Sequence, residues 1–229
     1  MILINGSPKQ KKSLTLGIAE AFIEGAGARP AETIDLYSKE IGACRGDMSC
    51  WFRTPGHCIL QDDARAIYES IRSADVVVWS VPVYVFGFPS QMIRLMERVM
   101  PWVKQKLVDD ESGRQTHPGL GGVGEPPRHI LIMSGALADT EADFKGAVYQ
   151  FRRMFGEDSV AITCGESNLF FMEKHPRIGA LTSEYKETAM QAGCEFASSG
   201  EVSEETFAKL NGQMMPKDEY TDLINGRVR

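Results

Sequence analysis

Short apolar runs alternate with longer amphipathic stretches along this chain of 229 residues. The run Asp75-Val-Val-Val-Trp-Ser80 is the strongest of them, and it suits a central strand that is buried on both faces. This alternation predicts an α/β protein in which helices cover both faces of a doubly wound parallel sheet. We expect five strands, at Met1–Asn5, Glu32–Leu36, Asp75–Ser80, His129–Ser134 and Ser159–Cys164.

The segments between these strands carry apolar residues at helical spacing. Two irregular segments, at about residues 37–60 and 104–127, interrupt the pattern, and both contain glycine and proline. We expect them to be insertions in one domain that spans residues 1–229, because no linker divides the chain. The expected helices are Ser13–Gly25, Gln61–Ala74 (capped by Asp62 or Asp63), Ser90–Val103, Thr140–Phe155, Thr182–Ala197 and a helical tail at about 203–225.

Charge and cysteine content restrict the partners and the cellular location that we expect for this protein. Lys and Arg number 25 against 31 Asp and Glu, so the net charge of −6 argues against a nucleic-acid partner. Five cysteines and no secretory leader at the N-terminus predict free thiols and a cytoplasmic location. Residues 76–93 are uncharged, but Pro82, Gly87 and Pro89 interrupt them, so we expect no membrane span.

The loop after the first strand is rich in hydroxyl and basic side chains. It runs from Asn5-Gly6-Ser7-Pro8-Lys9 to Ser13-Leu14-Thr15 and opens a helix, where backbone N–H groups favour an anion. The spaced glycines of a dinucleotide fingerprint and the glycine pattern of a P-loop are both absent. The loop therefore suits a terminal phosphomonoester, and the alternative is an ordinary strand-to-helix turn with a solvated lysine cluster.

The loop after the third strand is aromatic. Tyr84, Phe86 and Phe88 follow Pro82-Val83 and can form a flat apolar wall with exposed backbone amides, which suits a planar heteroaromatic ring. The alternative is that these rings pack under the following helix. The small loop Ser134-Gly135-Ala136-Leu137 after the fourth strand lets a ring edge approach. Ligands of such sheets bind beyond the carboxyl ends of the strands.

Taken together, these loops resemble those of the flavodoxin-like NAD(P)H-dependent oxidoreductases, the family of FMN reductases and quinone reductases. The matching residues are Gly6-Ser7-Pro8, Ser13-x-Thr15 and Pro82-Val83-Tyr84. The resemblance implies a five-stranded sheet of order 2-1-3-4-5 and an FMN cofactor. It implies cofactor contacts from Ser7, Lys9, Ser13, Leu14, Thr15, Pro82, Val83, Tyr84, Val85, Phe86, Ser134 and Gly135.

The segment from Cys44 to Cys58 looks like the cysteine loop of the iron–sulfur flavoproteins, a branch of the same family. Only Cys44, Cys50 and Cys58 are present, and Asp47 stands where that branch has another cysteine. A cluster is normally held by four thiolates, so three thiols and a carboxylate form a poor site. A zinc site would need His57, whose neighbour Cys58 is also a ligand, and this makes joint ligation awkward. We expect no metal.

The resulting hypothesis is an FMN-dependent oxidoreductase that takes hydride from NADH or NADPH at flavin N5 and reduces a quinone or another small acceptor. The chemistry belongs to the cofactor, so no side chain is assigned a catalytic role. The main alternative is a flavodoxin-type electron carrier with a protein partner. The resemblance also implies a homodimer or homotetramer. The candidate interface residues are Phe207, Leu210, Met214, Met215 and Leu223.

Overall fold

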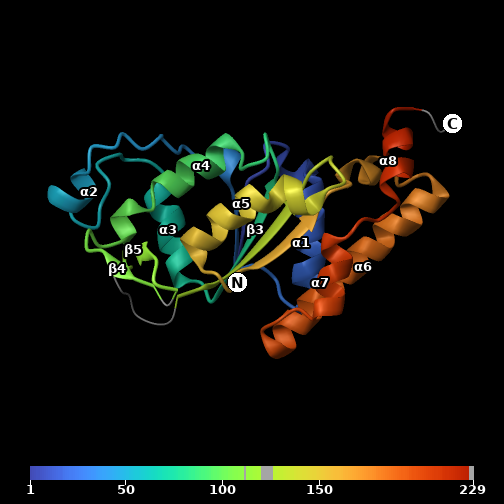
Figure 1. The fold of residues 1–229 in the computed structure, drawn as a ribbon. Coiled ribbons are helices and arrows are strands. Elements are labelled where there is room, and N and C mark those ends of the chain that lie inside the picture. Colours follow the sequence, from blue (N-terminus) through green and yellow to red (C-terminus); the bar gives the residue numbers. More distant parts are fainter. Residues whose placement is uncertain (111, 120–125, 227–229) are drawn as a thin grey trace.

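A computed structural model of the chain describes residues 1–110, 112–119 and 126–226. Its centre is a five-stranded parallel sheet of order β2-β1-β3-β6-β7, which confirms the expected fold class (Figure 1). Each strand lies within one or two residues of its predicted range. The strands are β1 Ile2–Asn5, β2 Glu32–Asp35, β3 Val76–Pro82, β6 Arg128–Ser134 and β7 Val160–Cys164.

Two layers of helices enclose the sheet, and strand residues alternate between them because successive side chains point to opposite faces. Trp79 of β3 packs toward the first of these helix layers, whereas Val78 packs toward the second. The first layer comprises α3 Ala64–Ser73, α4 Ser90–Glu97 and α5 Thr140–Phe155. The second comprises α1 Leu14–Gly25, α6 Pro176–Ser199 and α7 Glu204–Asn211, and α8 Lys217–Ile224 ends the described chain.

Some predicted boundaries were wrong. Helix α6 begins at Pro176, six residues before the predicted start, because proline is well placed in the first turn of a helix. The helix expected to reach Val103 ends at Glu97 and is followed by a short 3-10 turn, Met100–Trp102, that contains Pro101. Proline lacks the N–H that an α-helix needs there.

The two predicted insertions contain short elements of their own. The first, residues 37–60, includes the one-turn helix α2, Ser49–Phe52. The second, residues 104–127, includes the antiparallel pair β4 Val108–Asp109 and β5 Gln115–Thr116, although it was expected to be a loop. Residues 111 and 120–125 of this insertion lie outside the described part of the chain. In that described part, no helix is both long and apolar enough to cross a membrane.

His129 is an ionisable group inside the core. It is buried beside Phe155, and its Nδ1 accepts a hydrogen bond of 3.1 Å from the Trp79 indole. Burial lowers the pKa of His129 from 6.5 to about 4, although Asp158 opposes this shift. The folded state therefore binds this proton less readily than the unfolded state, and stability is lost as the pH falls from about 6.5 to about 4.

We predict that His129→Gln removes most of this pH dependence. Between pH 7 and pH 4 the wild type should lose about 3 kcal/mol more free energy of unfolding than the variant. Glutamine retains an acceptor for Trp79 but does not titrate. Urea denaturation at several pH values measures the difference, and parallel pH profiles for the two proteins would contradict the prediction.

Candidate functional site

The predicted loops meet at one edge of the sheet. The chain leaves β1 toward β2 on one side and returns to β3 on the other, so β1 and β3 are neighbours at a topological switch point. The loops that follow β1, β3 and β6 leave from the carboxyl ends of adjacent parallel strands. Ligands of open α/β sheets bind at such a place.

The loop after β1 is held by short polar contacts. The Asn5 side chain donates to Asp35 on β2 at 2.6 Å, and its oxygen accepts the N–H of Ser7 at 3.1 Å. The buried Ser7 hydroxyl then accepts the N–H of Lys9 at 3.3 Å. These contacts shape the loop without any ligand, so the hydroxyl of Ser7 already has one partner inside the chain.

Helix α1 begins directly after this loop. Ser13 is its N-cap, and the Ser13 hydroxyl accepts the N–H of Leu16 at 3.4 Å. The N–H groups of Leu14 and Thr15, in the first turn, have no acceptor within the helix. Together with the helix dipole they form a site that favours an anion. The Lys9 ammonium is in the same loop and lies 4.8 Å from the centroid of the Phe171 ring.

A buried hydrogen bond joins this loop region to the end of β6. The hydroxyls of Thr15 and Ser134 are 2.5 Å apart, and both residues are buried. The Ser134 carbonyl in turn accepts the N–H of Val83 at 2.8 Å. The structure therefore brings together residues from all three predicted loops. The hydroxyls of Thr15 and Ser134 thus bond to each other, and the backbone N–H of Thr15 lies in the first turn of α1.

The loop after β3 presents apolar side chains to solvent. Tyr84 and Gly87 exchange backbone hydrogen bonds of 3.0 Å, and this closes a two-residue turn at Val85 and Phe86. Both turn residues have positive φ, 52° and 60°, and the Val85 side chain is 96% exposed. A β-branched residue rarely adopts this conformation, and backbone strain of this kind is often found at functional sites. The side chains of Tyr84 and Phe86 are exposed here, whereas Phe88 is buried in the core beside Phe151, so the predicted wall of three rings is wrong for Phe88.

A cavity of about 200 Å³ separates this turn from the loop after β6. Gly135 forms part of its wall: a Cβ on Gly135 would lie 3.1 Å from the Phe144 ring and 3.6 Å from Val83. A side chain at this position would therefore crowd the cavity. Ala136 and Leu137, which also line it, belong to the small loop predicted after the fourth strand, whereas Asp143 and Phe144 were not predicted as site residues. Both lie within α5, beyond the loop, so nothing in the local sequence marks them as site residues.

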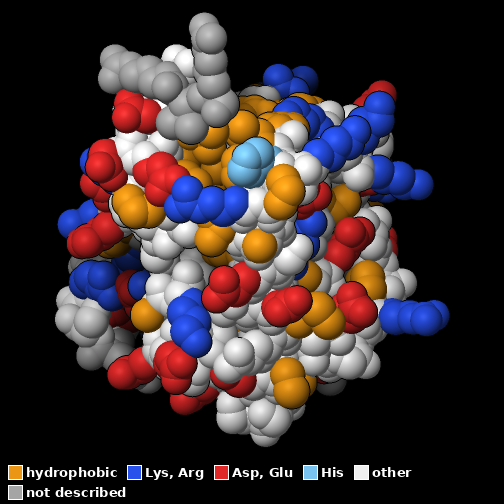
Figure 2. Space-filling view, turned by 90° about the vertical axis from the view of Figure 1, so that its right-hand side faces the viewer, with side chains coloured by type: hydrophobic (Ala, Val, Ile, Leu, Met, Phe, Trp, Pro, Cys, Tyr) orange, Lys and Arg blue, Asp and Glu red, His pale blue; other side chains and the backbone are white. Residues whose placement is uncertain are grey.

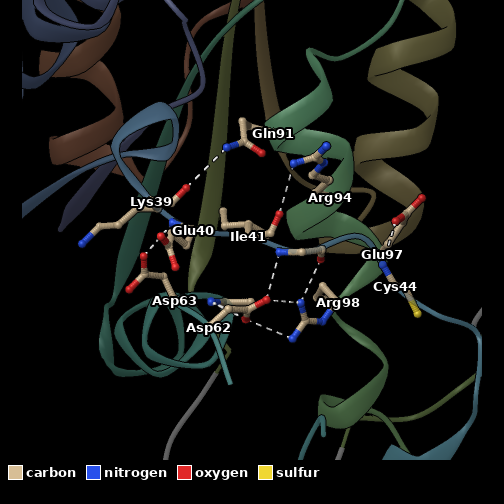
Figure 3. A network of polar contacts seen from close by, with 12 residues as sticks. Lys39, Glu40, Ile41, Cys44, Asp62, Asp63, Gln91, Arg94, Glu97 and Arg98 are labelled. Atoms are coloured by element: carbon tan, nitrogen blue, oxygen red, sulfur yellow. Dashed lines mark hydrogen bonds and ion pairs between the residues drawn. The ribbon is translucent and has the colours of Figure 1, made fainter. Parts of the chain in front are cut away.

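The cysteine loop is anchored by a polar network (Figure 3). Asp62 accepts hydrogen bonds from the Arg98 guanidinium at 2.6 Å and 3.1 Å and from the N–H of Gly42 at 2.9 Å. Arg98 also donates to the Gly42 carbonyl at 2.9 Å, and Glu97 accepts the N–H of Cys44 at 3.2 Å. Segment 40–44 is thereby fixed against α3 and α4.

The predicted cap of α3 takes a different form. Asp63 occupies the N-cap position without a capping hydrogen bond and instead accepts the N–H of Glu40 at 2.8 Å (Figure 3). Asp62 accepts the N–H of Ala64 at 3.2 Å in addition to its contacts with Arg98 and Gly42. The two acids therefore serve mainly to hold the preceding segment.

The donor set of the cysteine loop does not fit an iron–sulfur cluster. Cys44 is exposed, and Cys50 and Cys58 are partly buried. The carboxylate of Asp47 accepts the N–H of Ser49 at 2.8 Å, so it caps the turn before α2. Within residues 1–110, 112–119 and 126–226, no three His, Cys, Asp or Glu side chains are placed to hold a metal ion. Burial, followed by the neighbouring Cys58, raises the pKa of the Cys50 thiol.

The C-terminal helices cover one side of the molecule. Figure 2 shows this side as a mixture of charged groups, with hydrophobic side chains gathered near its upper edge. Leu210 and Met215, predicted to lie at a subunit interface, are instead buried within the chain. Leu210 packs in the core under α1 and α6, and Met215 packs against Tyr220 and Ile178. The prediction was wrong for these two residues because the tail folds back onto its own domain.

Comparison with known proteins agrees with the fold described above. Residues 1–156 match a family described as having a flavodoxin-like fold. The chain belongs to the flavodoxin-like fold family. It is similar to the iron–sulfur flavoprotein of Methanosarcina thermophila, with 32% identity over 97 residues, which are 42% of this chain and 49% of that protein. The chain thus spans about half the length of that relative.

Two further proteins that are similar to this chain are named for redox activity. One is an FMN-dependent NADH:quinone oxidoreductase from Exiguobacterium, 25% identical over 162 residues, which cover 64% of this chain and 74% of that protein. The other is a solved FMN-dependent NADH-azoreductase from Bacillus anthracis in complex with FMN. It has 19% identity and a TM-score of 0.55, and the match covers 86% of this chain and 96% of that one. The structural likeness shows the shared fold.

Proposed function

We propose that this flavodoxin-like chain is an FMN-dependent oxidoreductase that uses NADH or NADPH to reduce a small acceptor such as a quinone. The observation that carries the proposal is the junction of the three loops. The anion-favouring start of α1 and the apolar cavity after β3 and β6 are joined through the Thr15–Ser134 hydrogen bond. FMN combines an anionic phosphate with a planar heteroaromatic ring whose faces are largely apolar, so the residues present fit it.

The proposal gives each group a specific role. The N–H groups of Leu14 and Thr15 and the Ser13 hydroxyl would bind the phosphate. Ser7 would hold the shape of the loop, and Lys9 would add a positive charge to it. Val83, Tyr84 and the Val85–Phe86 turn would cover one face of the ring, with Gly135 at its edge. Bound FMN would supply two-electron chemistry between a nicotinamide and the acceptor. The exposed turn leaves room for a second substrate.

The names of the relatives support the same chemistry. The Exiguobacterium and Bacillus anthracis proteins are both described as FMN-dependent and NADH-using. The iron–sulfur flavoprotein relatives suggest an added cluster, but three thiols and an engaged Asp47 do not make the usual four-thiolate site. We therefore derive no step through a cluster.

Anaerobic absorbance spectroscopy tests the activity. The protein reconstituted with FMN should show an oxidised flavin spectrum that bleaches promptly when NADH or NADPH is added. A flavin that binds but stays oxidised would favour an electron carrier with a protein partner. A protein that binds no FMN would contradict the whole proposal.

The phosphate site is tested with Ser13→Leu. A bulky apolar side chain at the start of α1 should weaken FMN binding by at least about tenfold, because the phosphate loses a hydroxyl donor and space. Riboflavin lacks the phosphate, so its affinity should change much less. Fluorescence titration of both ligands gives the two dissociation constants.

Ser203→Leu is the matched control. Ser203 is the N-cap of α7 and accepts the N–H of Thr206 at 3.3 Å. Its replacement therefore removes a capping hydrogen bond similar to that of Ser13, but far from the three loops. This variant should bind FMN like the wild type. An unchanged FMN affinity in Ser13→Leu would contradict the assignment of the phosphate to α1.

A further inference from the structure

The segment between α7 and α8 runs along the loop that follows β6. Thr140 donates to the Asn211 carbonyl at 2.6 Å, and Gln213 donates to the Ala138 carbonyl at 3.4 Å. From α8, the Tyr220 hydroxyl donates to the Ala136 carbonyl at 2.7 Å. The C-terminal part of the chain therefore contacts this loop at two points and the first residue of α5 at a third, although about 75 residues separate the partners in sequence.

A buried carboxylate holds the segment between α7 and α8 in place. Glu166, just after β7, is 1% exposed, and one of its oxygens accepts the N–H groups of Met214 and Met215. Its other oxygen has no hydrogen-bond partner among the described residues. Burial raises the pKa of Glu166, and the two backbone hydrogen bonds partly oppose this rise. The position of α8, and hence of Tyr220, thus depends on contacts buried in the protein.

The directions of two N–H groups in this loop follow from the hydrogen bonds of the neighbouring carbonyls. The Gly135 carbonyl accepts the N–H of Ser167 at 3.0 Å, and the Ala136 carbonyl accepts the Tyr220 hydroxyl. In a trans peptide the N–H of the next residue points opposite to the carbonyl. The Ala136 N–H therefore points away from Ser167, and the Leu137 N–H points away from Tyr220. Gly135, Ala136 and Leu137 are also the residues that line the cavity.

We propose that Tyr220 is a positioning residue for the flavin ring, because its hydroxyl holds the Ala136–Leu137 peptide with the Leu137 N–H directed at the ring edge. This inference rests on the proposed function. Tyr220 is 4% exposed, and burial raises its pKa to about 12, so its hydroxyl remains a donor at neutral pH. The tyrosine does not line the cavity and acts only through the loop.

Tyr220→Phe tests the inference, since it removes only the hydroxyl. The dissociation constants of FMN and riboflavin should both rise by about five- to tenfold, because the freed peptide presents its N–H less often. The visible absorption bands of the bound flavin should also shift, since the polar contact at the ring changes. An effect on FMN without one on riboflavin would place the change at the phosphate and overturn the inference.

Tyr185→Phe is the matched control. Tyr185 is also 4% exposed, and its hydroxyl donates to a backbone carbonyl, that of Leu210, at 2.8 Å. Thermal denaturation should show similar losses of stability in the two variants, whereas only Tyr220→Phe should change flavin affinity. Equal effects of both variants, or none from Tyr220→Phe, would overturn the inference while leaving the proposed function intact. A wild type that binds neither FMN nor riboflavin would overturn both.

Discussion

Gly193→Ala should lower the free energy of unfolding by about 4 kcal/mol, an unusually large effect for one added methyl group. Gly193 lies on α6 where that helix crosses α1. A Cβ at this position would lie 1.9 Å from the Phe22 carbonyl oxygen and 2.8 Å from the Ala26 nitrogen. Both are backbone atoms of α1 or its end, so they cannot move aside as a side chain could. The two helices would have to separate.

A glycine on each of the two helices lies against the backbone of the other helix, which strengthens this expectation. Gly25, at the end of α1, faces the Met190 carbonyl oxygen of α6, and a Cβ there would lie only 1.8 Å away. Gly17→Ala in α1 is the control, because nothing lies within 4 Å of its Cβ position. That variant should gain about 0.5–1 kcal/mol, since alanine favours a helix more than glycine. Chemical denaturation compares the variants, and equal stabilities of Gly193→Ala and Gly17→Ala would refute the close crossing.

Arg98→Met should cost a similar amount, about 4 kcal/mol, because it leaves the Asp62 carboxylate buried without its cation. The Arg98 and Asp62 side chains are only 2% and 11% exposed, and their closest atoms are 2.6 Å apart. Burial alone would raise the pKa of Asp62, but hydrogen bonds from Arg98 and Gly42 outweigh it and lower the pKa. The wild type should therefore lose this stabilisation only as the pH falls below about 4.

An exposed ion pair on the neighbouring helix provides the comparison. Arg65 and Glu69 on α3 are 2.8 Å apart, but their side chains are 63% and 52% exposed. Arg65→Met should change stability by less than about 0.5 kcal/mol, because water already screens that pair. Denaturant titrations at pH 7 give both values. If Arg98→Met cost no more than Arg65→Met, the network in Figure 3 would not anchor the cysteine loop.

Much of the fold could be predicted because the pattern of apolar residues in a segment indicates whether that segment forms a strand or a helix. The valine-rich run at Asp75–Ser80 predicts a strand covered on both faces, and β3 indeed lies at the centre of the sheet. The loops after β1, β3 and β6 were predicted to carry the site, because parallel strands end at a common edge. The start of α6 was missed, since Pro176 and Gly179 interrupt the helical pattern.

The support of the candidate site could not be predicted in the same way. Thr15 and Ser134 lie 119 residues apart, yet their hydroxyls meet at 2.5 Å. Glu166 and Tyr220 carry no local signal, because an isolated acid or tyrosine usually lies at a surface. The tail was expected to face another subunit, whereas Leu210 and Met215 are buried in its own domain.

The sequence by itself therefore determined the alternation of strands and helices, the strand that lies at the centre, and the loops that leave the carboxyl ends of the neighbouring strands. Periodicity and turn residues act over a few positions, so they can be read directly from neighbouring letters. The tertiary structure alone decided that α1 and α6 cross at Gly25 and Gly193, that Asp62 meets Arg98, and that Tyr220 reaches Ala136. Such contacts depend on how distant elements pack, because their hydrogen bonds and close approaches exist only once the sheet and its helices have come together.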